Sequence, residues 1–292
     1  MFHGVYTAIV TPWQGGTLDV KKLEELVAHQ IEAGVQGVVV CGTTGESLSL
    51  SPTDQTHLVQ IAADVCKGKI RVMAATGSIS TEETILQTNA AQKAGADSAL
   101  LISPWYTRPT QDNLYHHFKA VHDQTDLPLM LYNNPARTGG DINVDTVIRL
   151  AQLPRIQGLK DGAPCLGRIA KLRTALGPDF PLMECLDDRL AAYLAMEGTG
   201  VVCVASNVVP DLYVQLMNAW NENDLATFKS IWHRLTPLLS ALGLEPNPGP
   251  IKYAVHLVHG IKDEYALSYV SLTPATKQAI QKALQDLGVW AP

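Results

Sequence analysis

Short runs of hydrophobic and β-branched residues recur along the chain up to residue 204. They cover residues 4–10, 37–41, 70–75, 98–103, 127–132, 156–160, 181–185 and 200–204. Continuous apolar runs of this length are typical of parallel strands that are buried on both faces. The pattern therefore predicts eight buried strands.

The segments between these runs have apolar residues at helical spacing, and two of them begin with helix start signals. Ser51 precedes Pro52, which is the pattern of an N-cap followed by proline in the first turn. Ser80 and Glu83 have the spacing of a capping box, in which each side chain satisfies a free backbone N–H of the other residue. The alternation of strands and helices predicts an α/β fold, a (β/α)8 TIM barrel.

The pattern changes after residue 204, where no further strand-like run follows. Helical periodicity covers residues 224–242, 250–259 and 274–287. We therefore expect a (β/α)8 barrel over residues 1–223 and a C-terminal all-helical region over residues 224–292. The chain has no glycine-rich dinucleotide or P-loop motif, which disfavours a nucleotide-binding sheet.

Composition and charge narrow the class of protein. The 292 residues are 46% hydrophobic and 17% charged, which provides the material for a large core. The formal net charge of −6, without a basic cluster, argues against nucleic acid or an anionic membrane surface as a partner. No uncharged apolar run is long enough to span a membrane. The five cysteines form no C-x-x-C pair and the N-terminus has no signal-peptide pattern, so we expect a cytoplasmic protein.

Lys160 is the most informative residue at a strand end. The active sites of β/α barrels lie at the carboxyl ends of the strands, and Lys160 ends the sixth apolar run, so we expect it to point into the barrel mouth. Burial of an amine disfavours its ammonium form and makes a lysine a nucleophile for carbonyl carbon. The alternative is a structural ion pair of Lys160 with Asp161 or Asp187, and position alone leaves both open.

A glycine-flanked pair of threonines follows the second apolar run. Gly42 and Gly45 let backbone amides turn toward a ligand, and the hydroxyls of Thr43 and Thr44 add further hydrogen-bond donors. Such a loop suits the carboxylate of a 2-oxo acid. The alternative is an ordinary glycine-rich turn.

Tyr106 and Tyr132 also lie at strand ends, and Arg137 lies in the loop after Tyr132. A phenol can pass a proton while it remains neutral near pH 7, and a guanidinium can hold a carboxylate through paired hydrogen bonds. Core packing of the tyrosines and a surface position of the arginine are the alternatives. The histidine pairs lack a matching carboxylate set, so we expect no metal site, and no serine-hydrolase motif is present.

Four motifs occur together in the order and spacing of a known family. They are GTTGES at residues 42–47, YNNP at 132–135, GLKD at 158–161 and NPGPIK at 247–252. On these motifs the chain resembles the dihydrodipicolinate synthase and N-acetylneuraminate lyase superfamily of class I aldolases, from residue 1 to about residue 287. The resemblance implies a catalytic barrel with a helical C-terminal region, assembled as a homotetramer.

The resemblance also implies roles for the residues at the strand ends. Lys160 would form a Schiff base with pyruvate, and Thr43 and Thr44 would hold the pyruvate carboxylate. Tyr132 would relay protons to and from the Schiff base. Tyr106 would reach across a dimer interface into the neighbouring site and complete a relay with Thr43.

The second substrate is indicated by the threonine pair and by Arg137. Synthases of the superfamily carry Thr-Thr where the sialic acid lyases typically carry Ser-Thr, and an arginine where the lyases tend to have an apolar residue. The resemblance therefore implies condensation of pyruvate with L-aspartate 4-semialdehyde to 4-hydroxy-tetrahydrodipicolinate, a step of lysine and diaminopimelate biosynthesis. Val202 would line the pocket behind Lys160, and no cofactor beyond the covalently bound pyruvate is implied.

Three positions depart from the synthase pattern and leave alternatives open. Gly162 stands where alanine is usual, Leu186 where glycine is usual, and Gly249 where an aliphatic residue is usual. The main alternative is another pyruvate-dependent aldolase or dehydratase, acting on N-acetylneuraminate or a 2-keto-3-deoxy sugar acid. A non-catalytic 2-oxo-acid-binding protein is the third hypothesis, which the joint presence of the lysine, both tyrosines and both threonines disfavours.

Feedback regulation is a separate prediction. Lysine-inhibited synthases hold the effector with histidine, asparagine and tyrosine side chains at the dimer interface. The corresponding positions here are Pro52, Gln55, Ile79 and Trp105, with only Glu83 retained. Because the apolar Ile79 cannot bind the carboxylate or the amine of lysine, we predict weak or absent inhibition.

Overall fold

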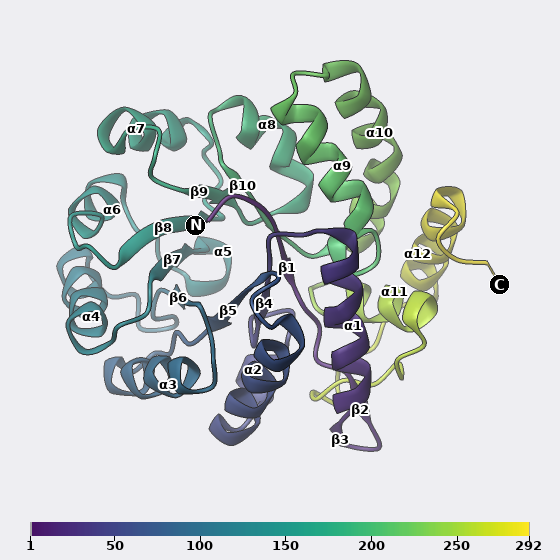
Figure 1. Ribbon diagram of the computed structural model, residues 1–292, viewed down its shortest axis with the longest axis horizontal. Coiled ribbons are helices and arrows are strands. Elements are labelled where there is room, and N and C mark those ends of the chain that lie inside the picture. The colour runs from purple at the N-terminus through teal and green to yellow at the C-terminus, as the bar shows by residue number, and fades with distance from the viewer. Residues whose placement is uncertain (1, 292) are drawn as a thin grey trace.

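A closed barrel of eight parallel strands forms the centre of the computed structural model, which describes residues 2–291 (Figure 1). The strands follow the order β1-β10-β9-β8-β7-β6-β5-β4 around the barrel. They are β1 (Gly4–Ala8), β4 (Gly37–Val40), β5 (Arg71–Ala75), β6 (Ser98–Ile102), β7 (Leu129–Asn133), β8 (Ile156–Asp161), β9 (Leu182–Glu184) and β10 (Gly200–Cys203). Each coincides with one of the eight apolar runs, so the predicted (β/α)8 fold is confirmed.

Two apolar layers explain why these strands lack alternation. One cluster fills the barrel interior and includes Tyr6, Met73, Met130 and Met183. A larger cluster lies between the strands and the surrounding helices. Because both faces of each strand are covered, polar residues are confined mostly to the strand ends. A short hairpin, β2 (Trp13–Gln14) and β3 (Thr17–Leu18), lies outside the barrel.

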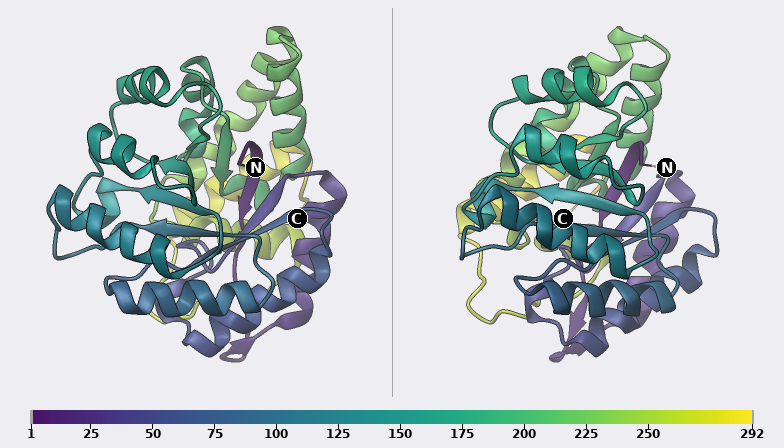
Figure 2. Two further views of the ribbon diagram at one scale, coloured as in Figure 1. Left: turned by 60° about the vertical axis from the view of Figure 1, so that its left-hand side comes forward. Right: turned by 90° about the vertical axis from the view of Figure 1, so that its left-hand side faces the viewer.

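Helices surround the barrel in the alternating order that the sequence predicts (Figure 2). They are α1 (Val20–Ala33), α2 (Pro52–Cys66), α3 (Thr81–Lys93), α4 (Gln111–Gln124), α5 (Pro135–Thr138), α6 (Val144–Leu150), α7 (Gly167–Leu176), α8 (Leu190–Ala195) and α9 (Pro210–Asn221). Short 3-10 turns, η1 (Ser47–Ser49), η2 (Asp187–Arg189) and η3 (Ala205–Asn207), lie after three of the strands.

The predicted helix starts are present, with one difference. Ser51 caps α2 and Ser80 caps α3, each by accepting a backbone N–H three residues later. Glu83 does not complete the capping box, because its carboxylate accepts a hydrogen bond from the Ser78 hydroxyl at 2.6 Å. The sequence pattern thus predicted the N-cap correctly, but the Glu83 carboxylate binds the Ser78 hydroxyl in place of the Ser80 backbone N–H.

Three helices follow the barrel: α10 (Leu225–Leu242), α11 (Gly249–His259) and α12 (Pro274–Leu287). Helix α10 packs against α9 and α12, and α11 packs against α12, so this helical region lies on one side of the barrel (Figure 1). The boundary expected at residue 223 falls between α9 and α10, and the division into two domains stays a prediction. Among residues 2–291, no helix is long and apolar enough to cross a membrane.

Candidate active site

Tyr132 and Lys160 lie side by side at the barrel mouth. They are paired in the parallel register of β7 and β8, so their side chains point to the same face. Tyr132 belongs to the interior cluster, which places that face inside the barrel. The Lys160 Nζ lies 4.2 Å from the centre of the Tyr132 ring, and only 7% of the Lys160 residue surface is exposed.

The two carboxylates proposed as ion-pair partners of Lys160 are engaged elsewhere. Asp161 points to the other face of β8 and pairs with Arg168 Nε at 3.1 Å. Asp187 accepts hydrogen bonds from the Tyr213 hydroxyl and from the backbone N–H of Val204. In the part of the chain that the structure describes, no ion pair involves Lys160. The amine is therefore available at the mouth.

Two polar side chains meet at the hydroxyl of Tyr132. The Asn134 side-chain amide donates to the phenol oxygen at 3.0 Å, and the Cys185 Sγ lies 3.5 Å from the same oxygen. Burial raises the pKa of Tyr132 well above its usual value, so the phenol is protonated at neutral pH. Tyr132 can therefore donate its proton to a bound substrate, and it must then regain a proton from a neighbouring group or from the substrate.

The threonine loop is held by the C-terminal helical region. The Thr44 hydroxyl accepts a hydrogen bond from the Asn247 amide at 3.0 Å, and the buried Glu46 forms an ion pair with the buried Lys252 of α11. The backbone N–H of Ala266 also donates to Glu46, at 2.7 Å. Thr43, the residue between these anchors and Gly42, is half-buried. The helical region thus fixes the shape of this loop.

The glycines of this loop act differently from the expectation. The positive φ angles are at Cys41 and Glu46, not at Gly42 or Gly45. A Cβ on Gly45 would lie 3.2 Å from the Cys41 nitrogen and 3.3 Å from the Ile9 oxygen, so close packing explains the glycine there. A Cβ on Gly42 would make only an ordinary contact, at 3.9 Å from the Val39 Cγ1, so close packing does not require a glycine there.

Two further predicted residues lie outside the buried group. Arg137 is exposed on α5, and its Nη2 donates to the backbone oxygen of Asn247 at 3.4 Å. Tyr106 is 91% exposed and has a φ of 68°, a conformation that L-residues rarely adopt. Val202, by contrast, is completely buried in the barrel interior. Tyr106 therefore does not join the Tyr132 hydroxyl within this chain.

Sequence reasoning missed three residues that the structure brings to the mouth. Asn134 contacts the Tyr132 hydroxyl, Cys185 contacts it from the position after β9, and Asn247 links Thr44 to Arg137. Asn134 and Asn247 belong to the YNNP and NPGPIK motifs, and these motifs were the sequence signal that could have identified them. Cys185 lies in an apolar run, which contained no signal for contact with a tyrosine.

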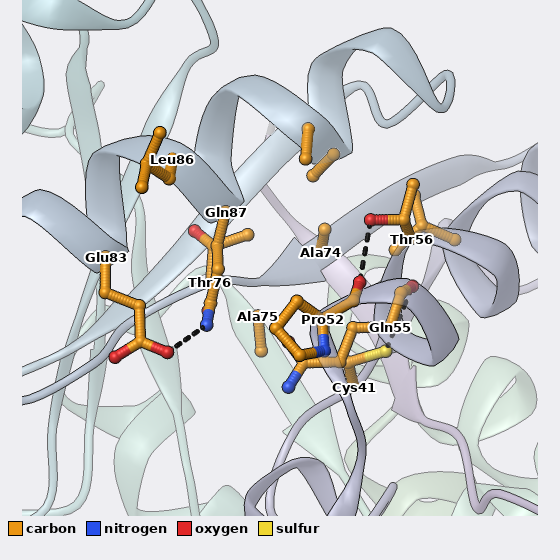
Figure 3. Close-up of a pocket in the computed structure, with 13 residues that line it drawn as sticks. Cys41, Pro52, Gln55, Thr56, Ala74, Ala75, Thr76, Glu83, Leu86 and Gln87 are labelled. Carbon is orange, nitrogen blue, oxygen red and sulfur yellow. Dashed lines mark hydrogen bonds between the residues drawn. The ribbon is translucent and has the colours of Figure 1, made fainter.

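A separate cavity of about 380 Å³ lies between α2 and α3 (Figure 3). Four alanines of β5 and α3 line it, and Pro52, Gln55 and Glu83 are among the other lining residues. Three of the five positions weighed for lysine binding therefore line this cavity. Ile79 is 53% exposed and Trp105 half-buried, and neither lines it.

The polar side chains at the barrel mouth determine which reactions the site can support. Over residues 2–291, no group of three or more histidine, cysteine, aspartate or glutamate side chains could hold a metal ion. The polar groups at the mouth are an amine, a phenol, hydroxyls, amides and a thiol. This set can form a carbonyl adduct on the amine and move protons next to it.

The fold and the mouth residues define a β/α-barrel enzyme with a buried lysine at the carboxyl ends of its strands. The family model of the dihydrodipicolinate synthetase family matches residues 1–287. The chain is 40% identical to 4-hydroxy-tetrahydrodipicolinate synthase of Rhodospirillum centenum over 289 residues, which cover 99% of each chain. The chain therefore belongs to the dihydrodipicolinate synthetase family, whose members are lyase-type aldolases.

Solved structures agree with this assignment. Dihydrodipicolinate synthase from Aquifex aeolicus superposes with a TM-score of 0.96 at 32% identity, covering 99% of each chain. Dihydrodipicolinate synthase from Thermotoga maritima also gives a TM-score of 0.96, at 36% identity and 99% coverage of both chains. The resemblance inferred from the four motifs is thus confirmed at the level of the family.

Proposed function

We propose that this protein condenses pyruvate with L-aspartate 4-semialdehyde through a Schiff base on Lys160, giving 4-hydroxy-tetrahydrodipicolinate for lysine and diaminopimelate synthesis. The observation that carries the proposal is the buried Lys160 amine, which faces the Tyr132 ring at 4.2 Å and has no carboxylate partner among residues 2–291. Relatives of matching length named 4-hydroxy-tetrahydrodipicolinate synthase support the choice of substrates.

The first half of the reaction forms an enamine. The Lys160 amine adds to C2 of pyruvate and water leaves, which gives an imine. Tyr132 supplies the proton that turns the departing hydroxyl into water. Loss of a proton from C3 then gives the enamine. Thr43, Thr44 and the backbone of the loop at Gly42 and Gly45 would hold the pyruvate carboxylate.

The second half forms the new carbon–carbon bond. C3 of the enamine adds to the aldehyde carbon, and the resulting alkoxide takes a proton from the relay. The amino group of the semialdehyde then displaces Lys160 from C2, which closes the ring and frees the amine. Arg137, on the exposed rim, would hold the carboxylate of the semialdehyde. Val202 would form the wall behind the imine, and no external cofactor takes part.

The exposed Tyr106 supports an oligomeric active unit. Its side chain is 91% exposed and its φ is positive, so it does not belong to the buried group of its own chain. Large exposed apolar side chains also occur at Leu48, Ile79 and Leu86. We therefore propose that two copies pair through this surface, that Tyr106 enters the partner's site, and that two such pairs form a homotetramer in the cytoplasm.

Borohydride reduction tests the Schiff base. Treatment in the presence of pyruvate is expected to leave a stable adduct on the peptide that contains Lys160, and the Lys160→Arg variant serves as the control without adduct. Absence of the adduct in the unmodified protein would favour a binding protein that has lost the chemistry.

A substrate panel tests the second substrate. We expect turnover with pyruvate and L-aspartate 4-semialdehyde in a coupled assay, and no cleavage of N-acetylneuraminate or of 2-keto-3-deoxy sugar acids. The reverse result, with the adduct on Lys160 intact, would assign the protein to another aldolase or dehydratase of the superfamily.

A further inference from the structure

Cys185 lies at the barrel mouth in contact with both groups that surround the reactive oxygen of Tyr132. Its Sγ lies 3.5 Å from the Tyr132 hydroxyl oxygen and 3.7 Å from the Asn134 amide nitrogen. The residue follows β9 and is buried, with its side chain in the interior cluster. Nothing in the proposed reaction has yet used this thiol.

The thiol is protonated at neutral pH. Burial raises the pKa of Cys185 above its usual value, and the positive charge of Lys160 opposes this effect only in part. A neutral thiol has one weak S–H donor, and its sulfur is a weak acceptor. The S–H donates to the Tyr132 oxygen, and the sulfur accepts a hydrogen bond from the Asn134 amide at 3.7 Å.

Two donors on the phenol oxygen determine where the phenol's own hydrogen points. The Asn134 amide occupies one acceptor position at 3.0 Å, and the Cys185 S–H occupies another at 3.5 Å. The remaining direction around the oxygen belongs to the O–H itself. It therefore points away from Asn134 and Cys185.

The backbone at Cys185 is held rigidly by a buried carboxylate. Glu184 Oε1 accepts hydrogen bonds from the backbone N–H of Cys185 at 2.7 Å and of Leu186 at 2.9 Å. Arg189 pairs with the same oxygen at 2.7 Å and donates to the Ala163 carbonyl at 2.7 Å. The end of β9 is thereby tied to the segment that follows Lys160.

Gly162 provides the space for the sulfur. A Cβ at this position would lie 3.3 Å from the Cys185 Sγ and 3.2 Å from the Asn133 carbonyl oxygen. Both distances are shorter than ordinary carbon contacts, so a larger residue would require the sulfur or the Asn133 carbonyl to shift by a few tenths of an ångström. Gly162 departs from the synthase pattern, and its small size matches the space that the Cys185 sulfur occupies.

We propose that Cys185 is a positioning residue for Tyr132, and that Gly162 maintains the space that its thiol requires. The S–H hydrogen bond fixes the phenol rotor so that its proton faces the reacting carbon. This role rests on the proposed function, because it serves the proton relay of Tyr132. It acts through Tyr132 and makes no contact with the substrate.

Replacement of the thiol tests the role directly. We expect Cys185→Ala to lower kcat about tenfold, in line with the loss of one hydrogen bond, with KM for pyruvate changed less than about twofold. Cys185→Ser keeps a donor and is expected to retain kcat within about threefold. Equal kcat for the native protein and Cys185→Ala would overturn the proposal, as would failure of serine to rescue activity in a folded variant.

The infrared S–H stretching band gives a readout independent of turnover. The band is assigned as the signal that Cys185→Ser removes, and a donating S–H absorbs at lower frequency than a free one. We expect Tyr132→Phe, which removes the acceptor, to move this band to higher frequency. An unchanged band would show that the thiol does not donate to the phenol.

A double-mutant cycle tests the match between the glycine and the thiol. Gly162→Ala alone is expected to lower kcat, and Cys185→Ser in the same chain to recover part of the loss, because the smaller hydroxyl leaves room for a Cβ. Independent effects of the two substitutions would overturn the match. Borohydride trapping on Lys160 in each variant keeps the two proposals separate, since loss of the adduct in the unmodified protein would instead contradict the Schiff-base function.

Discussion

Lys160 and Tyr132 occupy paired positions on β8 and β7, and the Lys160 Nζ faces the Tyr132 ring at 4.2 Å. This pairing follows from the register of two parallel strands, so neither residue can leave it without a shift of a whole strand. An amine and a protonated phenol are thus held together inside the barrel mouth. This arrangement suits an imine on Lys160, because its formation and breakdown need a proton donor beside the imine carbon.

Tyr132→Phe should separate proton relay from carbonyl binding. We expect kcat to fall by about 10²–10⁴-fold, since the variant removes the phenol O–H and keeps the ring beside Lys160. Steady-state kinetics and borohydride trapping would be compared in the same preparation. Trapping should become slower but still reach the Lys160 peptide, and an unchanged kcat would rule out Tyr132 as the relay.

Tyr106 should act in the partner's site. Tyr106→Phe and Lys160→Ala are each expected to be nearly inactive as pure proteins. Mixed oligomers of the two variants contain some sites with both native residues, so activity should partly return on unfolding and refolding them together. If the mixture stays inactive while forming mixed oligomers by native mass spectrometry, Tyr106 does not work across the interface.

Arg137 should determine affinity for the second substrate alone. Arg137→Ala is expected to raise KM for L-aspartate 4-semialdehyde by about 10- to 100-fold, the range for one charge-assisted hydrogen-bonded pair, with KM for pyruvate nearly unchanged. Arg137→Lys keeps the positive charge but not the paired hydrogen bonds, so its KM for the semialdehyde should lie between those of the native protein and Arg137→Ala. A parallel rise in both KM values would indicate a general effect on the mouth.

Lysine should inhibit weakly or not at all. Ile79 offers no polar group to an amino acid, and the Glu83 carboxylate already accepts hydrogen bonds from Ser78 at 2.6 Å and Gln87 at 3.0 Å. Initial rates at increasing L-lysine are the measurement, with a lysine-inhibited synthase assayed alongside. Inhibition at sub-millimolar lysine would contradict the prediction.

His117 should make stability depend on pH. Burial lowers the pKa of His117 from 6.5 to about 4, although the Glu82 carboxylate opposes the shift. Between pH 6.5 and about 4 the unfolded chain binds a proton that the folded chain does not, so stability falls as the pH falls through this window and the loss is complete below it. We expect His117→Asn to reduce that fall by roughly 1–3 kcal/mol in urea unfolding, whereas the exposed His116→Asn should not.

The eight strands and the strand-end position of Lys160 could be read from the sequence because both depend on local pattern. Buried parallel strands need continuous apolar runs, and each run gave one barrel strand within a few residues. The four motifs carried the family for the same reason, since their spacing is preserved along the chain. The threonine pair and Tyr132 were also found in this way, and their catalytic roles stay predictions.

Tertiary structure alone decided the surroundings of these residues, because the contacts join distant segments. Lys160 could have formed an ion pair with Asp161 or Asp187. Arg168 binds Asp161 and Tyr213 binds Asp187, and both partners come from other elements. Cys185 meets the Tyr132 hydroxyl across 53 residues of sequence, and Asn247 meets Thr44 across 203. No periodicity along the chain encodes such approaches. Strand register and helix packing create them only when the barrel closes.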